Sequence, residues 1–153
     1  MQVITDHDAI VSHWVSVSSD DLTFPPNCFF HMELRFTEWN PEERTLTARF
    51  PMKSEFFNPR NFIQGGFLVA ALDNVLGPLS YLSGFPSVTT QLNTTFIRPA
   101  ARDLQYFQVQ AEIVDVTNTR VYSKAEALGP SGGILAYIQA TSQIVAPSSD
   151  GAS

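Results

Sequence analysis

Residues 62–82 read FIQGGFLVAALDNVLGPLSYL, and this stretch decides the fold. From Gly65 onward it is apolar at nearly every position, so a helix here must be enclosed on most of its sides. Its length would also suit a membrane span, but Asp73 lies at its centre, where a charge in lipid is costly. Gly65, Gly66 and Pro78 interrupt the run as well. The stretch therefore predicts the buried central helix of a soluble protein with no membrane partner.

Strand-like segments lie on both sides of this helix, and those at 29–40, 44–52, 104–116 and 119–129 place their apolar residues on one face. Two precede it, at 29–40 and 44–52, and they are joined by a turn at 40–43. In the first, Phe30, Met32, Leu34 and Phe36 are expected on the buried face. Four follow, at about 87–98, 104–116, 119–129 and 133–145, and a Gly-rich hairpin loop joins the last two. A single curved antiparallel sheet of about six strands around one helix satisfies this order, so we expect an α+β fold.

The two ends of the chain differ from this central part. Segment 5–17 predicts a short helix that Thr5 caps, and a loop with Pro25-Pro26 follows it. The last residues, PSSDGAS, are expected to be disordered. We therefore divide the chain into a helix and loop at 1–27, a domain at 28–146 and a tail at 147–153.

Composition narrows the classes of partner. The chain has 153 residues, 44% of them hydrophobic and 16% charged, with a formal net charge of −6. That is enough for one domain with its own core, and the acidic balance argues against a nucleic-acid partner. Cys28 is the single cysteine and no signal peptide opens the chain, so we expect a cytoplasmic protein without disulfides. The three histidines lack the spacing of metal ligands, so no metal is expected.

Asp73 is the most unusual residue of the central stretch, because it is the only formally charged residue between Arg60 and Arg98. Burial raises the pKa of a carboxyl group and makes it a candidate catalytic base. The alternative is an acid that hydrogen-bonds to nearby backbone or faces solvent near a helix end.

Gln64, Gly65 and Gly66 stand where the helix is expected to begin. Backbone N–H groups at a helix N-terminus point outward unpaired, and glycines let a substrate carbonyl approach them, which together make an oxyanion site. Gly66 and Asp73 are seven residues apart and share a helix face, about 10 Å apart along the axis. The pair therefore requires an extended substrate or a second chain. A Gly-Gly pair can equally mark a turn or a close contact between helix and sheet.

These residues carry a resemblance to a known family. NPRNFIQGGFLVAALDN, at 58–74, resembles the signature of the hotdog-fold thioesterases, in particular the group of phenylacetate-pathway acyl-CoA thioesterases, in which an Asn, a His-Gly-Gly and an Asp follow one another. TTQLNTTFIRPA, at 89–100, resembles the strand after the central helix. TRVYSKAEAL and LAYIQATSQI resemble the last two strands. The resemblance covers about residues 28–146.

The resemblance implies a hotdog fold and the hydrolysis of an acyl-CoA thioester, without a cofactor, at a site between two subunits. Asp73 would be the general base or nucleophile, Gly66 the oxyanion donor, and Asn58 the amide that places water or the thioester. Thr89 would come from the partner chain and orient the water, with Thr90 beside it. Gln64 stands where the family usually has His, and its amide can donate a hydrogen bond but cannot transfer a proton.

Binding of CoA by an acidic chain requires local basic groups for the phosphates. The candidates, each of which could instead be a solvated surface charge, are Arg60, Arg98, Arg102, Arg120 and Lys124. Gly65 would bind substrate beside Gly66. The acyl group is not defined, because the phenylalanines around the Gly-Gly pair fit an apolar or aryl tunnel and core packing equally well.

Two other functions stay open. A non-catalytic acyl-CoA or lipid-binding hotdog protein is compatible with Gln64, whereas Asp73 with Asn58 favours the enzyme. A dehydratase is disfavoured, because it would need a histidine with an acid and no histidine lies near the Gly-Gly loop in the sequence.

The segment at 87–98, SVTTQLNTTFIR, predicts the assembly. It has no charge before Arg98 and neither proline nor glycine. A free sheet edge of this composition would invite aggregation. We therefore expect it to pair with its own copy across a two-fold axis, giving an obligate dimer and further a dimer of dimers. The pairing would bring Thr89 and Thr90 toward the Gly66 end of the partner's helix.

Overall fold

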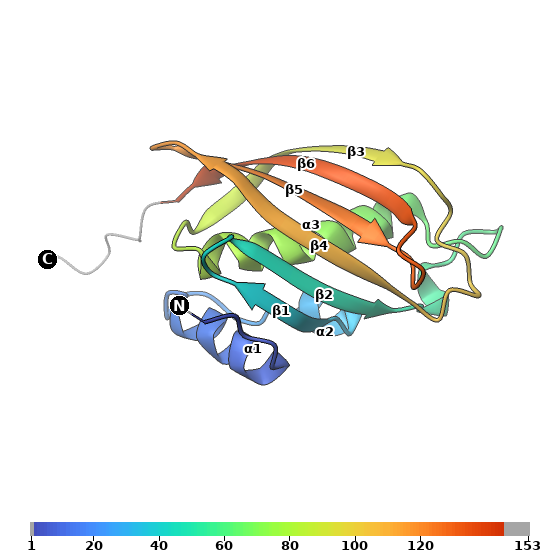
Figure 1. Cartoon of the computed structure of the whole chain (residues 1–153), viewed down its shortest axis with the longest axis horizontal. Coiled ribbons are helices and arrows are strands. Elements are labelled where there is room, and N and C mark those ends of the chain that lie inside the picture. Colours follow the sequence, from blue (N-terminus) through green and yellow to red (C-terminus); the bar gives the residue numbers. More distant parts are fainter. Residues whose placement is uncertain (1, 146–153) are drawn as a thin grey trace, which may run out of the picture.

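The computed structural model describes residues 2–145 and has one antiparallel sheet curved around a long helix (Figure 1). The sheet has six strands in the order β1-β2-β4-β5-β6-β3, and α3 (Gly65–Leu82) lies against its concave face. This arrangement confirms the predicted fold class. The strands are β1 (Arg35–Asn40), β2 (Thr45–Pro51), β3 (Ser87–Phe96), β4 (Tyr106–Val116), β5 (Arg120–Leu128) and β6 (Ile134–Ile144). The predicted tail at 147–153 lies outside the described residues.

Helix α3 is enclosed by the sheet along one face and open along the other. Leu72, Val75 and Leu79 on the enclosed face are fully buried against the inward side chains of the strands. Gly66 and Gly77 lie on the open face, where no atom stands within 4 Å of the position that a Cβ would take. By length and composition α3 could also span a membrane, but 50% of it is buried in the protein, as in a core helix.

The beginning of the strand predicted at 29–40 is wrong. Residues Asn27–Met32 form a short helix, α2, and β1 begins only at Arg35. The helix buries Phe29 and Met32, which are three residues apart, and leaves Phe30 59% exposed. Glu33 then ends α2 in the left-handed conformation, with φ 54°. The predicted alternation therefore holds only from Leu34 onward, where Leu34 and Phe36 are buried.

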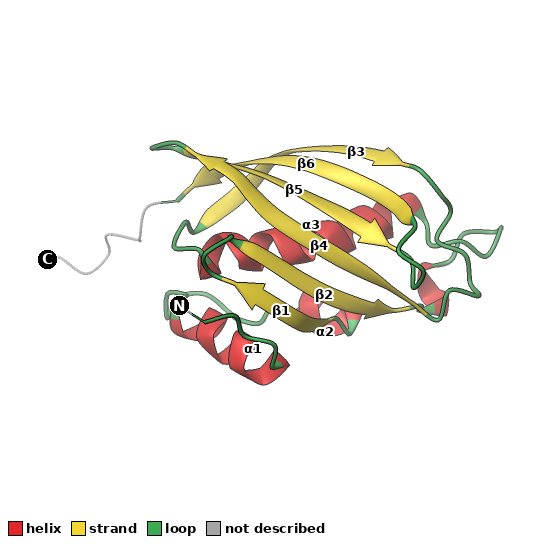
Figure 2. Ribbon diagram, in the orientation of Figure 1, coloured by secondary structure: helices red, strands yellow, loops and turns green. Residues whose placement is uncertain are grey.

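The N-terminal segment closes one edge of the sheet. Helix α1 (His7–Ser16) is capped by Asp6, which accepts a hydrogen bond from the Ala9 N–H at 2.8 Å, and not by Thr5 as predicted. Before it, Ile4 and Trp39 exchange two backbone hydrogen bonds, of 2.9 and 2.8 Å, along the free side of β1. Helices α1 and α2 lie on the β1–β2 side of the molecule (Figure 2). Helix α2 spans the predicted boundary between residues 27 and 28.

The other edge of the sheet, β3, is bare. Within residues 2–145 this strand pairs only with β6, and Val88 and Phe96 are 56% and 52% exposed. Its register shifts between Thr89 and Gln91, which marks a β-bulge. Thr90 is the extra residue of the bulge, and its hydroxyl donates to the Thr141 carbonyl at 3.0 Å. A bulge changes which side chains face the inner side of the sheet, so Thr89 turns toward α3.

Candidate active site

Asp73 and Thr89 form a polar pair between α3 and β3. The Thr89 hydroxyl donates to Asp73 Oδ1 at 3.0 Å, and both residues are half-buried. Burial raises the pKa of the Asp73 carboxyl, while the Thr89 hydrogen bond favours the charged form and opposes that shift. A carboxyl group with a raised pKa and a hydroxyl aimed at it are the parts of a general base.

The two residues of this pair belong to one chain. The Thr89 hydroxyl therefore reaches Asp73 without a partner, and the placement of Thr89 near the Gly66 of a second chain, which the resemblance implies, stays a prediction. Thr90 does not join the pair, because its exposed side chain is bonded to β6. The bulge separates the roles of two neighbouring threonines that the sequence alone treats alike.

The first turn of α3 presents free backbone donors. Gln64 is the N-cap residue, and its carbonyl accepts hydrogen bonds from the N–H groups of Phe67 and Leu68. Within residues 2–145 the N–H groups of Gly65 and Gly66 have no acceptor. The two glycines differ: a Cβ on Gly65 would lie 2.9 Å from the Phe96 ring, whereas Gly66 faces open space. Gly65 therefore permits close packing, and Gly66 permits the approach of a substrate.

Asn58 lies in the loop before α3, and only the oxygen of its side-chain amide is hydrogen-bonded within residues 2–145. Its Oδ1 accepts from the N–H groups of Arg60 and Phe62, at 2.9 and 3.2 Å. Its Nδ2 has no partner in the part of the chain that the structure describes. Asn58 and Gly65 line one cavity of about 360 Å³, together with Phe96 and Arg98. The structure thus brings three predicted site residues, Asn58, Gly65 and Arg98, to one cavity.

The five basic candidates for CoA separate into two groups. Arg98 donates to the Ile134 carbonyl at 2.9 Å beside the β5–β6 hairpin, and the Arg102 N–H donates to the Asn61 carbonyl at 3.1 Å. Arg60 belongs to the same loop as Asn61, so the three arginines lie in loops next to the N-terminal end of α3. Arg120 lies at the opposite end of β5, and Lys124 on the outer face is paired with Glu112 at 3.2 Å.

The donors of the first turn and the acid do not meet within one chain. Gly66 and Asp73 both lie on the open face of α3, about 10 Å apart along the axis at 1.5 Å per residue. A thioester carbonyl held at Gly66 would be too far from the Asp73 carboxylate for direct proton transfer through one water. One chain therefore holds the donors and the acid at separate places on one helix face.

The three histidines pack against neighbouring residues, and one of them, His31, lies nearer to the Gly-Gly loop than the sequence suggests. His7 Nδ1 accepts from the Phe36 N–H at 2.9 Å, and His13 stacks on Trp39. His31 lies closer to the loop than its sequence position suggests, because its ring packs 5.7 Å from that of Phe56, whose carbonyl accepts from the Gln64 N–H. No group of His, Cys, Asp and Glu within residues 2–145 could hold a metal ion.

No protein-family model and no curated protein matches the sequence. Solved structures of one architecture match this chain over most of its length, and several of them are named as thioesterases. The chain has the hotdog fold. A thioesterase-like, phenylacetic acid degradation-related protein from Ralstonia eutropha superimposes with a TM-score of 0.75 at 21% identity, over 86% of this chain and 99% of that one. The PaaI protein of the Escherichia coli phenylacetic acid operon gives 0.71 at 14% identity, over 76% and 86%.

A third hotdog structure carries a ligand. It is a hypothetical thioesterase from Streptococcus pneumoniae solved with coenzyme A, with a TM-score of 0.68 at 14% identity, over 73% of this chain and 85% of that one. At such identities the likeness establishes the fold of this hotdog chain, and the assignment of its residues rests on their own geometry.

Proposed function

We propose that the protein is an acyl-CoA thioesterase, which hydrolyses a thioester to a free acid and CoA. The observation that carries the proposal is the half-buried Asp73 carboxyl with the Thr89 hydroxyl on it, on the same open helix face as the unpaired N–H of Gly66. Named thioesterases among the structural neighbours support it.

The chemistry follows from these groups. Asp73, once ionised, removes a proton from a water molecule that attacks the thioester carbonyl. In the alternative route Asp73 attacks the carbonyl itself, and water then hydrolyses the mixed anhydride that remains on Asp73 after the C–S bond has broken. Negative charge develops on the carbonyl oxygen, and the Gly66 N–H stabilises it. The C–S bond then breaks, and the CoA thiolate leaves and takes up a proton. Asn58 Nδ2 and the Gln64 amide supply further hydrogen-bond donors at the carbonyl.

We propose that the complete site contains two chains. The 10 Å between Gly66 and Asp73 is bridged if a second copy places its own Gly66, Asn58 and Gln64 over Asp73 and Thr89 of the first. The bare edge of β3 and the open face of α3 are the surfaces for such a dimer, and a dimer of dimers would follow from a second contact.

CoA would enter at the N-terminal end of α3. Arg60 and Arg98 supply positive charge there, beside the cavity that Asn58 and Gly65 line, and Arg102 adds a third cation. Arg120 lies at the far end of β5 in the same chain, so it would reach this ligand only from the partner. We keep the cytoplasm as the proposed compartment, on the ground of the single free Cys28.

A non-catalytic acyl-CoA-binding protein is the second candidate, and Gln64 is the observation that favours it. An amide at this place binds a carbonyl without transferring a proton. Gln64→His would raise turnover if the amide limits an enzyme, and would leave a pure binder inactive.

The decisive experiment is a turnover assay over a panel of short, long and aryl acyl-CoA thioesters, in which a dye traps the released thiol. Calorimetric titration with CoA is run on the same samples. Turnover that disappears in Asp73→Asn supports the enzyme. Tight binding of acyl-CoA with no turnover in either protein would favour the binder.

A further inference from the structure

We propose that Lys53 is a positioning residue for the oxyanion end of α3: it holds Phe56, and Phe56 fixes the turn that presents the Gly65 and Gly66 N–H groups. The inference rests on the proposed function for its kinetic consequence. The positioning itself can be measured without any substrate.

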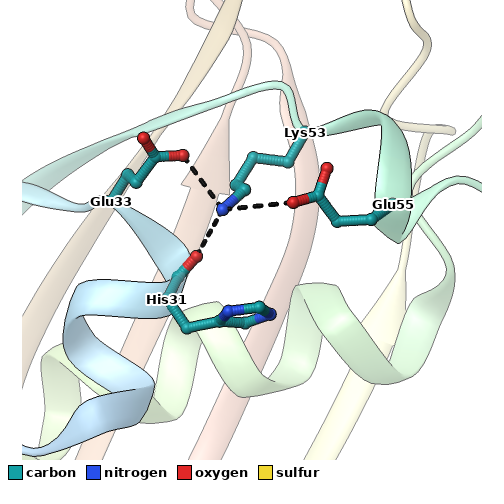
Figure 3. Close-up of polar contacts among 4 residues, drawn as sticks. All are labelled: His31, Glu33, Lys53 and Glu55. Atoms are coloured by element: carbon teal, nitrogen blue, oxygen red, sulfur yellow. Dashed lines mark hydrogen bonds and ion pairs between the residues drawn. The ribbon is translucent and has the colours of Figure 1, made fainter.

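The ammonium group of Lys53 joins two parts of the chain that precede α3 (Figure 3). It donates to the His31 carbonyl at 2.6 Å, at the end of α2, and pairs with Glu33 at 2.9 Å and Glu55 at 3.3 Å. The Lys53 side chain is only 13% exposed, whereas those of Glu33 and Glu55 are 62% and 53% exposed. The three acceptors therefore converge on one ammonium group at the end of a largely covered side chain.

This contact sets the position of a short 3-10 helix, Ser54–Phe56, named η1. The Lys53 ammonium also lies 5.5 Å from the centre of the Phe56 ring. The backbone carbonyl of Lys53 accepts a hydrogen bond from the Phe56 N–H at 3.1 Å. Lys53 thus holds Phe56 through both its side chain and its backbone.

Phe56 in turn holds the beginning of α3 at two points. Its carbonyl accepts from the Gln64 N–H at 2.9 Å, and its ring stacks on Phe67 with centroids 4.4 Å apart. Gln64 and Phe67 flank the two glycines directly. A shift of Phe56 would therefore turn the free N–H groups of Gly65 and Gly66, and a small misplacement of a catalytic group is enough to slow a reaction greatly.

The ion pairs of Lys53 contribute little to the free energy of folding, because both glutamates are exposed. The proposal rests on where the contacts of Lys53 lie. His31 is in α2 and Glu33 is its C-cap residue, whereas Glu55 and Phe56 are in η1. Loss of the cation should therefore affect the geometry of the turn more than the stability of the core.

Lys124 provides a matched control. It forms one ion pair, with Glu112 at 3.2 Å, where Lys53 forms two. Lys124 lies on the outer face of the sheet, away from α3 and from the cavity beside Gly65, and its side chain is 55% exposed. Lys53→Met and Lys124→Met make the same change in charge and size at the two places. Lys53→Arg keeps the cation and its donors.

Two measurements on the full chain test the proposal. Hydrogen–deuterium exchange of the segment 56–68 should speed up in Lys53→Met and stay at the wild-type rate in Lys124→Met. With acyl-CoA, Lys53→Met should lose about 10-fold or more in kcat while KM changes less than about twofold. Lys53→Arg should recover most of both losses.

The outcomes separate this proposal from the proposed function. If no variant and no wild-type protein turns over acyl-CoA, the exchange experiment still decides the positioning. Unchanged exchange in 56–68 of Lys53→Met, or equal effects in Lys124→Met, overturns the proposal. If Lys53→Met does not fold, Glu33→Gln replaces it, and wild-type exchange and kcat in Glu33→Gln then count against the role of the cluster.

Discussion

The first and third turns of α3 carry the candidate chemistry, and they are equipped differently. The first turn has free N–H groups, the Asn58 amide and a cavity with nearby arginines. The third turn has an acid with a raised pKa and a hydroxyl from β3. Neither turn alone can hydrolyse a thioester, because donors without a base and a base without donors each lack half of the reaction. This difference is the ground for our proposal of a site assembled from two copies of the helix.

The two edges of the sheet differ in the same sense. The β1 edge is closed by Ile4, which pairs with Trp39, whereas the β3 edge exposes apolar side chains and unpaired backbone. Natural proteins protect such edges, so the edge next to Thr89 is the one that a second chain would cover. The following predictions break or sharpen these contrasts, from the largest effect to the smallest.

Charges on the open edge should have the largest effect. Thr90→Lys with Leu92→Lys adds two charges to the edge strand of each chain, which should break the dimer and abolish turnover together. Light scattering and the thiol assay are measured on one sample. A double lysine on the outer face of β4, Gln108→Lys with Gln110→Lys, is the control and should stay dimeric. A stable, active monomer of about 17 kDa would contradict the edge pairing.

Replacement of the acid should come next. Asp73→Asn should keep the fold and lose about 10²-fold or more in turnover. Folding raises the pKa of Asp73. The wild-type carboxyl therefore lowers the free energy of unfolding as pH rises from the ordinary pKa of an aspartate to the raised one, and the loss stays constant above that. Asp73→Asn should therefore gain thermal stability relative to wild type at neutral pH, and the gain should vanish in acid. Wild-type turnover in the variant would remove Asp73 from the mechanism.

Removal of the hydroxyl should produce a smaller, pH-dependent effect. Thr89→Val deletes the hydrogen bond that favours ionised Asp73, so the pKa should rise further. The acid limb of kcat/KM should then move to higher pH, with a loss of about 10-fold on that limb and less at alkaline pH. Thr47→Val, on β2, makes the same change away from the site. An unmoved acid limb in Thr89→Val would show that the pair does not titrate as proposed.

The sequence predicts most of the fold because its signals are periodic. The apolar run of α3 is buried as a helix, and β2, β4 and β5 each bury the apolar side chains that share one face, such as Leu46, Phe107 and Val121. It predicts α2 wrongly, since Phe30, Met32 and Leu34 alternate by coincidence ahead of a strand. Nothing in the chain before Leu34 distinguishes a short helix from a half-buried strand by periodicity alone.

The site is predictable in part. Asp73 stands out because the surrounding core lacks charge, and the Gly-Gly pair because helices seldom begin so. The place of Thr89 depends on a bulge that no glycine or proline marks, and bulges follow from pairing across the sheet. The link from Lys53 through Phe56 to Gln64 joins residues by tertiary contacts only, so the sequence contains no local signal for it.

The central claim, a site shared by two chains, is tested most directly by mixing two inactive variants. Asp73→Asn lacks the base, and Asn58→Asp keeps the Oδ1 that holds its loop but loses the Nδ2 donor. The two are unfolded and refolded together, with each refolded alone as the control. If one chain supplies Asp73 and the other Asn58, half of the dimers are mixed and each has one intact site of two, so about a quarter of wild-type activity returns. If both residues of a site come from one chain, every site contains a defect, and the mixture stays as inactive as its parts.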